Sequence, residues 1–143
     1  SLVLKMFWAE FCRKGIKPPI HLPTITSNID LQRHLQKVSY KKIYLFRAGL
    51  IINESVIKTG LEILNVHAAM VPKYGGIGSI NRALNDRAYD QFASLHTVTT
   101  NIDRGEVIDR EPFTLNPQKS YFRNEGIAYD AAISLLLRSL WSK

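Results

Sequence analysis

The sequence predicts an α/β fold in which a mostly parallel sheet is flanked by helices. Segments with helical periodicity alternate with short apolar runs typical of strands, and the chain ends on a long amphipathic stretch. It has 143 residues, 45% of them hydrophobic, so one sizeable core is expected. No repeat, low-complexity tract or linker divides the sequence, and we expect residues 1–143 to form a single domain.

The first expected element is a helix over residues 4–15. Lys14 and Gly15 supply its cationic last turn and its C-terminal stop. Residues 20–25 follow and could form a short strand bounded by prolines. The apolar side chains of the helix recur at i, i+3, i+4, i+7 and i+8 and so share one face: Leu4, Phe7, Trp8, Phe11 and Cys12.

A second helix and a first confident strand are expected next. Ser27 or Asn28 could cap a helix that runs through residues 31–38. Residues 43–46 predict a buried strand, which passes into a turn at residues 48–49.

The alternation then continues. Asn53 is the expected N-cap of a short helix that ends at Gly60. Residues 62–67 predict a second strand, and a loop over residues 72–78 leads to a helix over residues 79–84.

Two strands and a long helix complete the predicted fold. Residues 93–98 and 105–113 have the apolar and β-branched composition of strands. Residues 121–140 predict the closing helix, with a buried stripe formed by Ala128, Ala131, Ala132, Leu135, Leu136 and Leu140.

Composition narrows the class of protein. The formal net charge is +7 and is spread along the chain, which suits small phosphorylated ligands as well as nucleic acid. The single cysteine, Cys12, excludes an internal disulfide framework and any Cys-based zinc site within one chain. One cysteine is what a reducing cytosol permits, so we expect a cytoplasmic protein. No apolar run approaches the roughly 18 residues of a membrane span.

Polar side chains interrupt the ends of the predicted strands. Asn65 and His67 close the strand at residues 62–67, and Asp103 lies in a turn between two later strands. In an open α/β sheet, ligands bind beyond the carboxyl ends of the strands. Asp103 should therefore lie close to His67 if the two strands are neighbours.

An amide, an imidazole and a carboxylate facing one pocket suit acyl transfer to an amine. The amide and a protonated imidazole can stabilise the negative charge that grows on the carbonyl oxygen. His67, or a water held by Asp103, can carry the proton that leaves the amine. A carboxylate beside the imidazole is expected to raise the pKa of His67 toward the working pH.

Two motifs carry a specific resemblance. The segment LNVHAAMVPKYGG, followed after a spacer by SLHTVTTNIDRGEVI, resembles the folate-dependent formyltransferase family. That family includes glycinamide ribonucleotide, methionyl-tRNA and amino-sugar N-formyltransferases. The resemblance runs from Leu4 to Leu140 and is strongest between Ile43 and Ile108. It implies a Rossmann-like formyltransferase fold.

The resemblance also implies the site. The catalytic trio of the family would be Asn65, His67 and Asp103 here. The formyl donor would be 10-formyltetrahydrofolate, with no metal. Its pterin would lie against two segments, mostly through main-chain contacts: Gly49, Leu50, Ile51 and Ile52 on one side, and Val98, Thr99 and Thr100 on the other.

The sequence departs from the family at its start. The family begins with a strand, a Gly-containing turn, a helix and a second strand, whereas this chain enters at the helix that follows them. We therefore expect an N-terminally incomplete, truncated form of the fold. Its exposed N-terminal apolar face would favour a homo-oligomer.

The expected reaction is formyl transfer to the primary amine of a small acceptor. The acceptor would be phosphorylated or nucleotide-linked, either a nucleotide-linked amino sugar or a compound like glycinamide ribonucleotide. The loop PKYGGIGSINRAL favours the amino sugar, because it resembles the sugar-modifying members more. Nucleic acid is not expected as a partner, since members that formylate tRNA carry an additional RNA-binding domain, and no membrane partner is expected.

Two alternatives remain at the sequence level. The chain could be a non-catalytic, truncated folate-binding or interaction module, or it could hydrolyse formyltetrahydrofolate with water. His96 is expected to be structural, and His21 and His34 incidental. Residues 74–76 could be an ordinary loop or a flexible flap over the acceptor.

Overall fold

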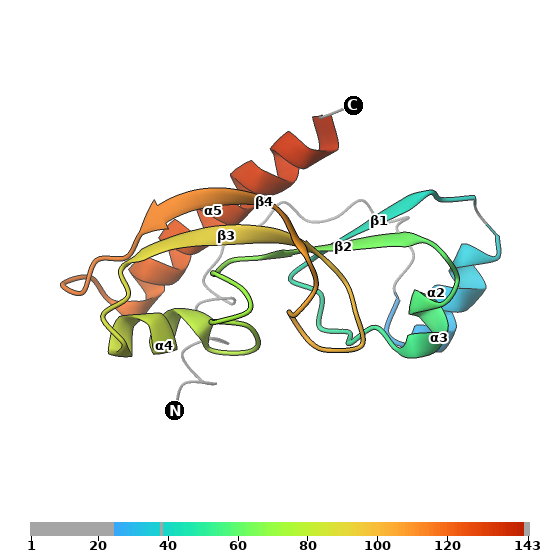
Figure 1. Cartoon of the computed structure of the whole chain (residues 1–143), viewed down its shortest axis with the longest axis horizontal. Coiled ribbons are helices and arrows are strands. Elements are labelled where there is room, and N and C mark those ends of the chain that lie inside the picture. The colour runs from blue at the N-terminus through green and yellow to red at the C-terminus, as the bar shows by residue number, and fades with distance from the viewer. Residues whose placement is uncertain (1–24, 38, 142–143) are drawn as a thin grey trace.

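The computed structural model describes residues 25–37 and 39–141 (Figure 1). The helix expected at residues 4–15, with the apolar face expected to join two copies, lies outside these ranges, as does nearly all of the strand expected at residues 20–25. The described elements are α2 (Asn28–Leu35), β1 (Lys42–Phe46), α3 (Glu54–Ile57), β2 (Glu62–His67), α4 (Ser79–Asn85), β3 (Asp90–Thr97), β4 (Val107–Thr114) and α5 (Tyr121–Trp141).

This element order confirms the predicted α/β alternation. Residues 62–67 form a strand with the expected bounds. Asn53 caps α3, because its side chain accepts a hydrogen bond from the Val56 amide. Ser27, the first of the two candidates, caps α2 by accepting from the Asp30 amide.

The prediction of a mostly parallel sheet is wrong for the described strands. The sheet has the order β1-β2-β3-β4, and β1 and β2 are parallel. The pairs β2–β3 and β3–β4 are both antiparallel. The reason lies in the connections: α4 stays near the carboxyl end of β2, so the chain enters β3 from that end, and only a loop joins β3 to β4 (Figure 1).

One face of the sheet packs against α5. Side chains alternate across a strand, so Leu64 and Val66 of β2 share this face with Ala93 and Leu95 of β3. They form a core with three buried residues of α5: Ala131, Ala132 and Leu135.

The opposite face carries a second core and leaves room for polar side chains. Ile63 packs there with Leu31 of α2 and Val56 of α3. Asn65 and His67 have the same parity as Ile63, so they project to this face and away from the α5 core.

The predicted stripe of α5 is right except at its end. Ala128, Ala131, Ala132 and Leu135 are buried and Leu136 is partly buried, but Leu140 is 53% exposed. The last turns of α5 still contact the sheet at its polar side chains: the Tyr44 hydroxyl of β1 donates to the Ser139 carbonyl, and Arg138 pairs with Asp109 of β4. No helix in residues 25–37 and 39–141 is long and apolar enough to cross a membrane.

The loop between β3 and β4 is closed tightly at its base. The Thr97 amide donates to the Glu106 carbonyl at 2.9 Å, and the Glu106 amide donates to Thr97 Oγ1 at 2.9 Å. Gly105 lies so close that a Cβ there would be 1.7 Å from the Thr97 carbonyl oxygen. Only glycine fits this position.

We expect Gly105→Ala to destabilise the protein by roughly 1–3 kcal/mol or more, because the backbone of Thr97 must move to admit a methyl group. Urea unfolding followed by circular dichroism measures the loss. Gly126→Ala in α5 is the matched control: its Cβ meets open space, and alanine favours a helix by up to about 1 kcal/mol. Equal unfolding midpoints for the two variants would contradict the tight closure.

Candidate active site

The strand β2 places two of the three predicted catalytic residues side by side. Asn65 and His67 are two positions apart and project from the same face of the sheet. His67 lies at the carboxyl end of the strand, where its side chain is 17% exposed.

Asp103 joins them by a route that differs from the predicted one. Because β2 and β3 are antiparallel, their carboxyl ends point in opposite directions. Thr97, at the carboxyl end of β3, is paired with Leu64 near the start of β2. The loop after β3 folds back across the face of the sheet and brings Asp103 to Asn65 and His67. In Figure 1 this loop lies below the strands. Asp103 adopts a left-handed backbone, with φ of 51°.

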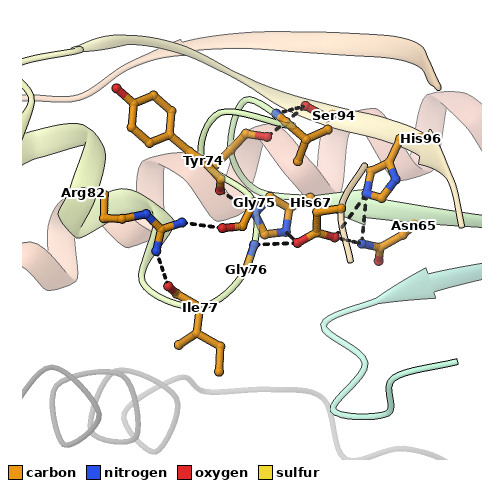
Figure 2. Close-up of polar contacts among 12 residues, drawn as sticks. Asn65, His67, Tyr74, Gly75, Gly76, Ile77, Arg82, Ser94 and His96 are labelled. Carbon is orange, nitrogen blue, oxygen red and sulfur yellow. Dashed lines mark hydrogen bonds and ion pairs between the residues drawn. The ribbon is translucent and has the colours of Figure 1, made fainter. Parts of the chain in front are cut away.

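The Asp103 carboxylate is the centre of the resulting polar cluster, and its partners Asn65, His67, Gly76 and His96 are labelled in Figure 2. Its Oδ1 lies 3.3 Å from Asn65 Nδ2 and 3.4 Å from His96 Nε2. Its Oδ2 accepts a 2.7 Å hydrogen bond from the Gly76 amide and lies 3.5 Å from His67 Nδ1. The structure thus brings Asn65, His67 and Asp103 together.

These contacts keep the carboxylate ionised. Burial alone raises the pKa of Asp103, but the hydrogen bond with His96, the charge that His67 carries at acidic pH and the Gly76 amide outweigh it. Together they lower the pKa of Asp103 to about 2.

His67 behaves differently from the sequence-based expectation. Burial lowers the pKa of its imidazole, and this effect exceeds the opposing influence of the Asp103 carboxylate and the Tyr74 carbonyl. Neighbouring His96 and Arg82 lower the pKa further. His67 is therefore neutral at neutral pH: the carboxylate raises its pKa as expected, but burial outweighs this effect and the net shift is downward.

His96 belongs to the cluster as well. It is 2% exposed, its Nδ1 contacts the Thr97 carbonyl at 2.9 Å, and its Nε2 lies 3.2 Å from Asn65 Nδ2. These contacts agree with its predicted structural role but extend it, since His96 supports both Asn65 and Asp103. Asn65 and His96 are paired across β2 and β3. This pairing would have indicated the contact between the two side chains, but it can be recognised only when the antiparallel register of the strands is known.

The cluster opens on a cavity of about 580 Å³. Asn65, His67, His96 and Asp103 line it. Six of the seven residues expected to hold the pterin also line it, whereas Thr100 is exposed and does not: Gly49, Leu50, Ile51, Ile52, Val98 and Thr99. Helix α5 supplies a further part of the wall that was not predicted from the sequence, which includes Tyr121, Glu125 and Tyr129.

The loop after β2 supports the cluster from the other side. The Tyr74 carbonyl lies 3.1 Å from His67 Nε2, and the buried Tyr74 ring donates its hydroxyl to Asp86 at 3.1 Å. The first residues of the same loop are anchored to β3: the Ser94 hydroxyl donates to the Ala69 carbonyl and accepts from the Val71 amide. This many anchors favour a fixed support over a flexible flap at residues 74–76.

Comparison with known proteins now places the chain. Residues 22–124 match the model of the Formyl transferase family. The chain belongs to this family, which confirms the resemblance found in its motifs.

Among its relatives are a bifunctional polymyxin resistance protein ArnA from Wigglesworthia glossinidia brevipalpis, 27% identical over 74% of this chain, and a methionyl-tRNA formyltransferase from Nitrosomonas eutropha, 25% identical over 69% of it. The matches cover 17% and 32% of those proteins. The chain thus spans a sixth to a third of the length of these relatives.

Solved structures confirm the fold. A phosphoribosylglycinamide formyltransferase from Streptococcus pneumoniae matches with a TM-score of 0.67 and 22% identity, over 80% of this chain and 66% of that one. A formyltetrahydrofolate deformylase from Pseudomonas syringae matches with a TM-score of 0.70 and 19% identity, over 78% of this chain and 38% of that one. In residues 25–37 and 39–141, no group of three or more His, Cys, Asp or Glu side chains could hold a metal ion.

Asp103→Asn tests the buried carboxylate. A native pKa of about 2, against 3.8 for the free group, stabilises the fold by roughly 2 kcal/mol at neutral pH. The native state binds fewer protons than the unfolded state between these values, so this stability is lost as pH falls from about 5 to 2. We expect the difference in unfolding free energy between wild type and Asp103→Asn to shrink over that range. The exposed Asp130→Asn is the control and should differ little from wild type.

NMR titration of the His67 ring tests the balance of burial and charge. We expect the wild-type ring to titrate below 6.5, because burial disfavours its cation. In Asp103→Asn the pKa of His67 should fall further, because the carboxylate that opposes burial is gone. Asp130→Asn should leave the titration unchanged. A pKa that rises in Asp103→Asn would refute this account.

Proposed function

We propose that the site transfers a formyl group from 10-formyltetrahydrofolate to the primary amine of a small acceptor. The observation that carries the proposal is the convergence of Asn65, His67 and Asp103 on one wall of the cavity. Membership of the Formyl transferase family supports it.

Asn65 would stabilise the oxyanion. As the amine nitrogen attacks the formyl carbon, a C–N bond forms and the carbonyl oxygen takes up the electron pair. Asn65 Nδ2 carries two hydrogens and donates one of them to Asp103 Oδ1 at 3.3 Å. His96 Nε2 donates to the same carboxylate and so does not accept the second hydrogen, which Asn65 can offer to the oxyanion.

His67 would accept the proton that leaves the amine. Because burial lowers its pKa, the ring is neutral at neutral pH, and its lone pair can take the proton through the water that Asp103 would orient. The tetrahedral intermediate then breaks its bond to N10 of the folate, and the proton moves from His67 to that nitrogen. The atoms and charges balance without a further reactant.

Asp103 would orient His67 and a water molecule. Its low pKa keeps it ionised through the cycle, so it stabilises the imidazolium formed in the first step.

The donor would bind between the two segments that sequence analysis singled out. Residues 49–52 follow β1 and residues 98–99 follow β3, and both line the cavity. Their largely apolar side chains and main-chain groups suit a flat heterocycle with amide-like edges.

The acceptor would be a small amine that carries negative charge. A net charge of +7 favours a phosphorylated or nucleotide-linked compound. We propose either a nucleotide-linked amino sugar or a compound like glycinamide ribonucleotide, and the loop PKYGGIGSINRAL favours the sugar.

The test is a formyl-transfer assay with 10-formyltetrahydrofolate and each candidate amine. Asn65→Ala, His67→Ala and Asp103→Ala should each lower kcat/KM by about 10²- to 10³-fold, because each removes a group that acts on the transition state. His34→Ala, a histidine that does not line the cavity, is the matched control and should retain activity.

The same assay separates the alternatives. Donor binding without transfer to either amine would contradict the proposal and favour a folate-binding module. Release of formate in the absence of an amine would identify hydrolysis instead.

A further inference from the structure

Arg82 of α4 holds the backbone of the loop that supports the site. Arg82 donates from Nη2 to the Gly75 carbonyl and from Nη1 to the Ile77 carbonyl (Figure 2). Both are charge-assisted hydrogen bonds, and a planar guanidinium can make the two together. Arg82 thereby fixes the residues on either side of Gly76.

Gly76 connects this anchor to the catalytic cluster. Its amide makes the 2.7 Å hydrogen bond to Asp103, which is shorter than the carboxylate's contacts with Asn65, His67 and His96. The Gly75 carbonyl and the Gly76 amide belong to one planar peptide group and point in opposite directions. Arg82 and Asp103 therefore hold the two ends of the same peptide group.

The orientation of this peptide group depends on its surroundings. Gly76 adopts a left-handed backbone, with φ of 75°, which glycine tolerates. A Cβ at Gly75 would lie 2.9 Å from Asp103 Cβ, so the loop approaches Asp103 as closely as the backbone allows. A small rotation of the peptide group would break the bond to Asp103.

We propose that Arg82 is a positioning residue for the reaction: through the Gly75–Gly76 peptide group it holds the amide that fixes the Asp103 carboxylate. This inference rests on the proposed function and assigns a role to a residue that does not line the cavity. The cation also polarises the peptide group, which strengthens the amide as a donor.

The charge of Arg82 reaches His67 as well. Four groups set the protonation of the ring besides its burial: Asp103 and the Tyr74 carbonyl raise its pKa, whereas His96 and Arg82 lower it. Loss of the Arg82 cation thus favours the imidazolium, so the pH dependence of the reaction should move with it.

Arg82→Gln and Arg82→Lys separate the hydrogen bonds from the charge. We expect Arg82→Gln to lower kcat about tenfold, as displaced catalytic groups do, with KM for the folate donor unchanged. The pKa values of Asp103 and His67 should both rise. Arg82→Lys keeps the charge but cannot form the fork, so His67 should titrate as in wild type while kcat falls. Arg123→Gln, an exposed arginine of α5 outside the cavity, should match wild type in every measurement.

NMR of the labelled protein provides a second reading that needs no turnover. In both Arg82 variants the Gly76 amide proton should shift upfield and exchange faster, because its carboxylate partner is no longer held. Should Arg82→Gln fail to fold, Arg82→Lys gives the same reading. An unchanged Gly76 signal together with an unchanged Asp103 titration would overturn the role of Arg82.

The two proposals can fail separately. If the wild-type chain transfers no formyl group, the proposed function fails, and the Gly76 and Asp103 signals still decide whether Arg82 positions the carboxylate. If the wild type is active and Arg82→Gln retains its kcat, the positioning role fails and the function stands.

Discussion

The buried carboxylate of Asp103 organises the site. Its partners come from separate parts of the chain: Asn65 and His67 from β2, His96 from β3, and the Gly76 amide from the loop before α4. A carboxylate removed from water is unfavourable unless donors compensate it, and here they lower its pKa to about 2. The same donors therefore help to fix the position of the loop after β3 across the face of the sheet.

The strand arrangement makes this convergence possible. Alternation along β2 directs Leu64 and Val66 to the α5 core and leaves Asn65 and His67 on the other face. The antiparallel register then sets His96 opposite Asn65. A one-residue slip between β2 and β3 would turn His96 into the α5 core and Leu95 toward the cavity. The hydrophobic core and the polar site thus enforce the same register.

Local patterns in the sequence predicted much of this architecture. Features that depend on contacts between distant parts of the chain were not predicted. The cap at Asn53, the strand at residues 62–67 and the side-by-side placement of Asn65 and His67 follow from short-range periodicity and hydrogen bonding. Strand direction depends on where α4 lies in space, so the prediction of a mostly parallel sheet was wrong for the described strands. The pKa of His67 depends chiefly on how deeply its ring is buried. The sequence motif shows that a carboxylate is near, but it does not show the burial. Arg82 escaped notice because its partners are backbone carbonyls, which carry no residue signature.

The two nitrogens of His67 show how the site can be neutral at rest and still favour proton transfer. Nε2 faces the Tyr74 carbonyl and Nδ1 faces the Asp103 carboxylate, so both nitrogens point at acceptors. A neutral ring can donate to only one of them. When the proton of the amine reaches His67 through the water beside Asp103, the second acceptor gains a donor without any movement of the backbone. Burial thus keeps the ring available as a base, and the two acceptors stabilise the imidazolium once it forms.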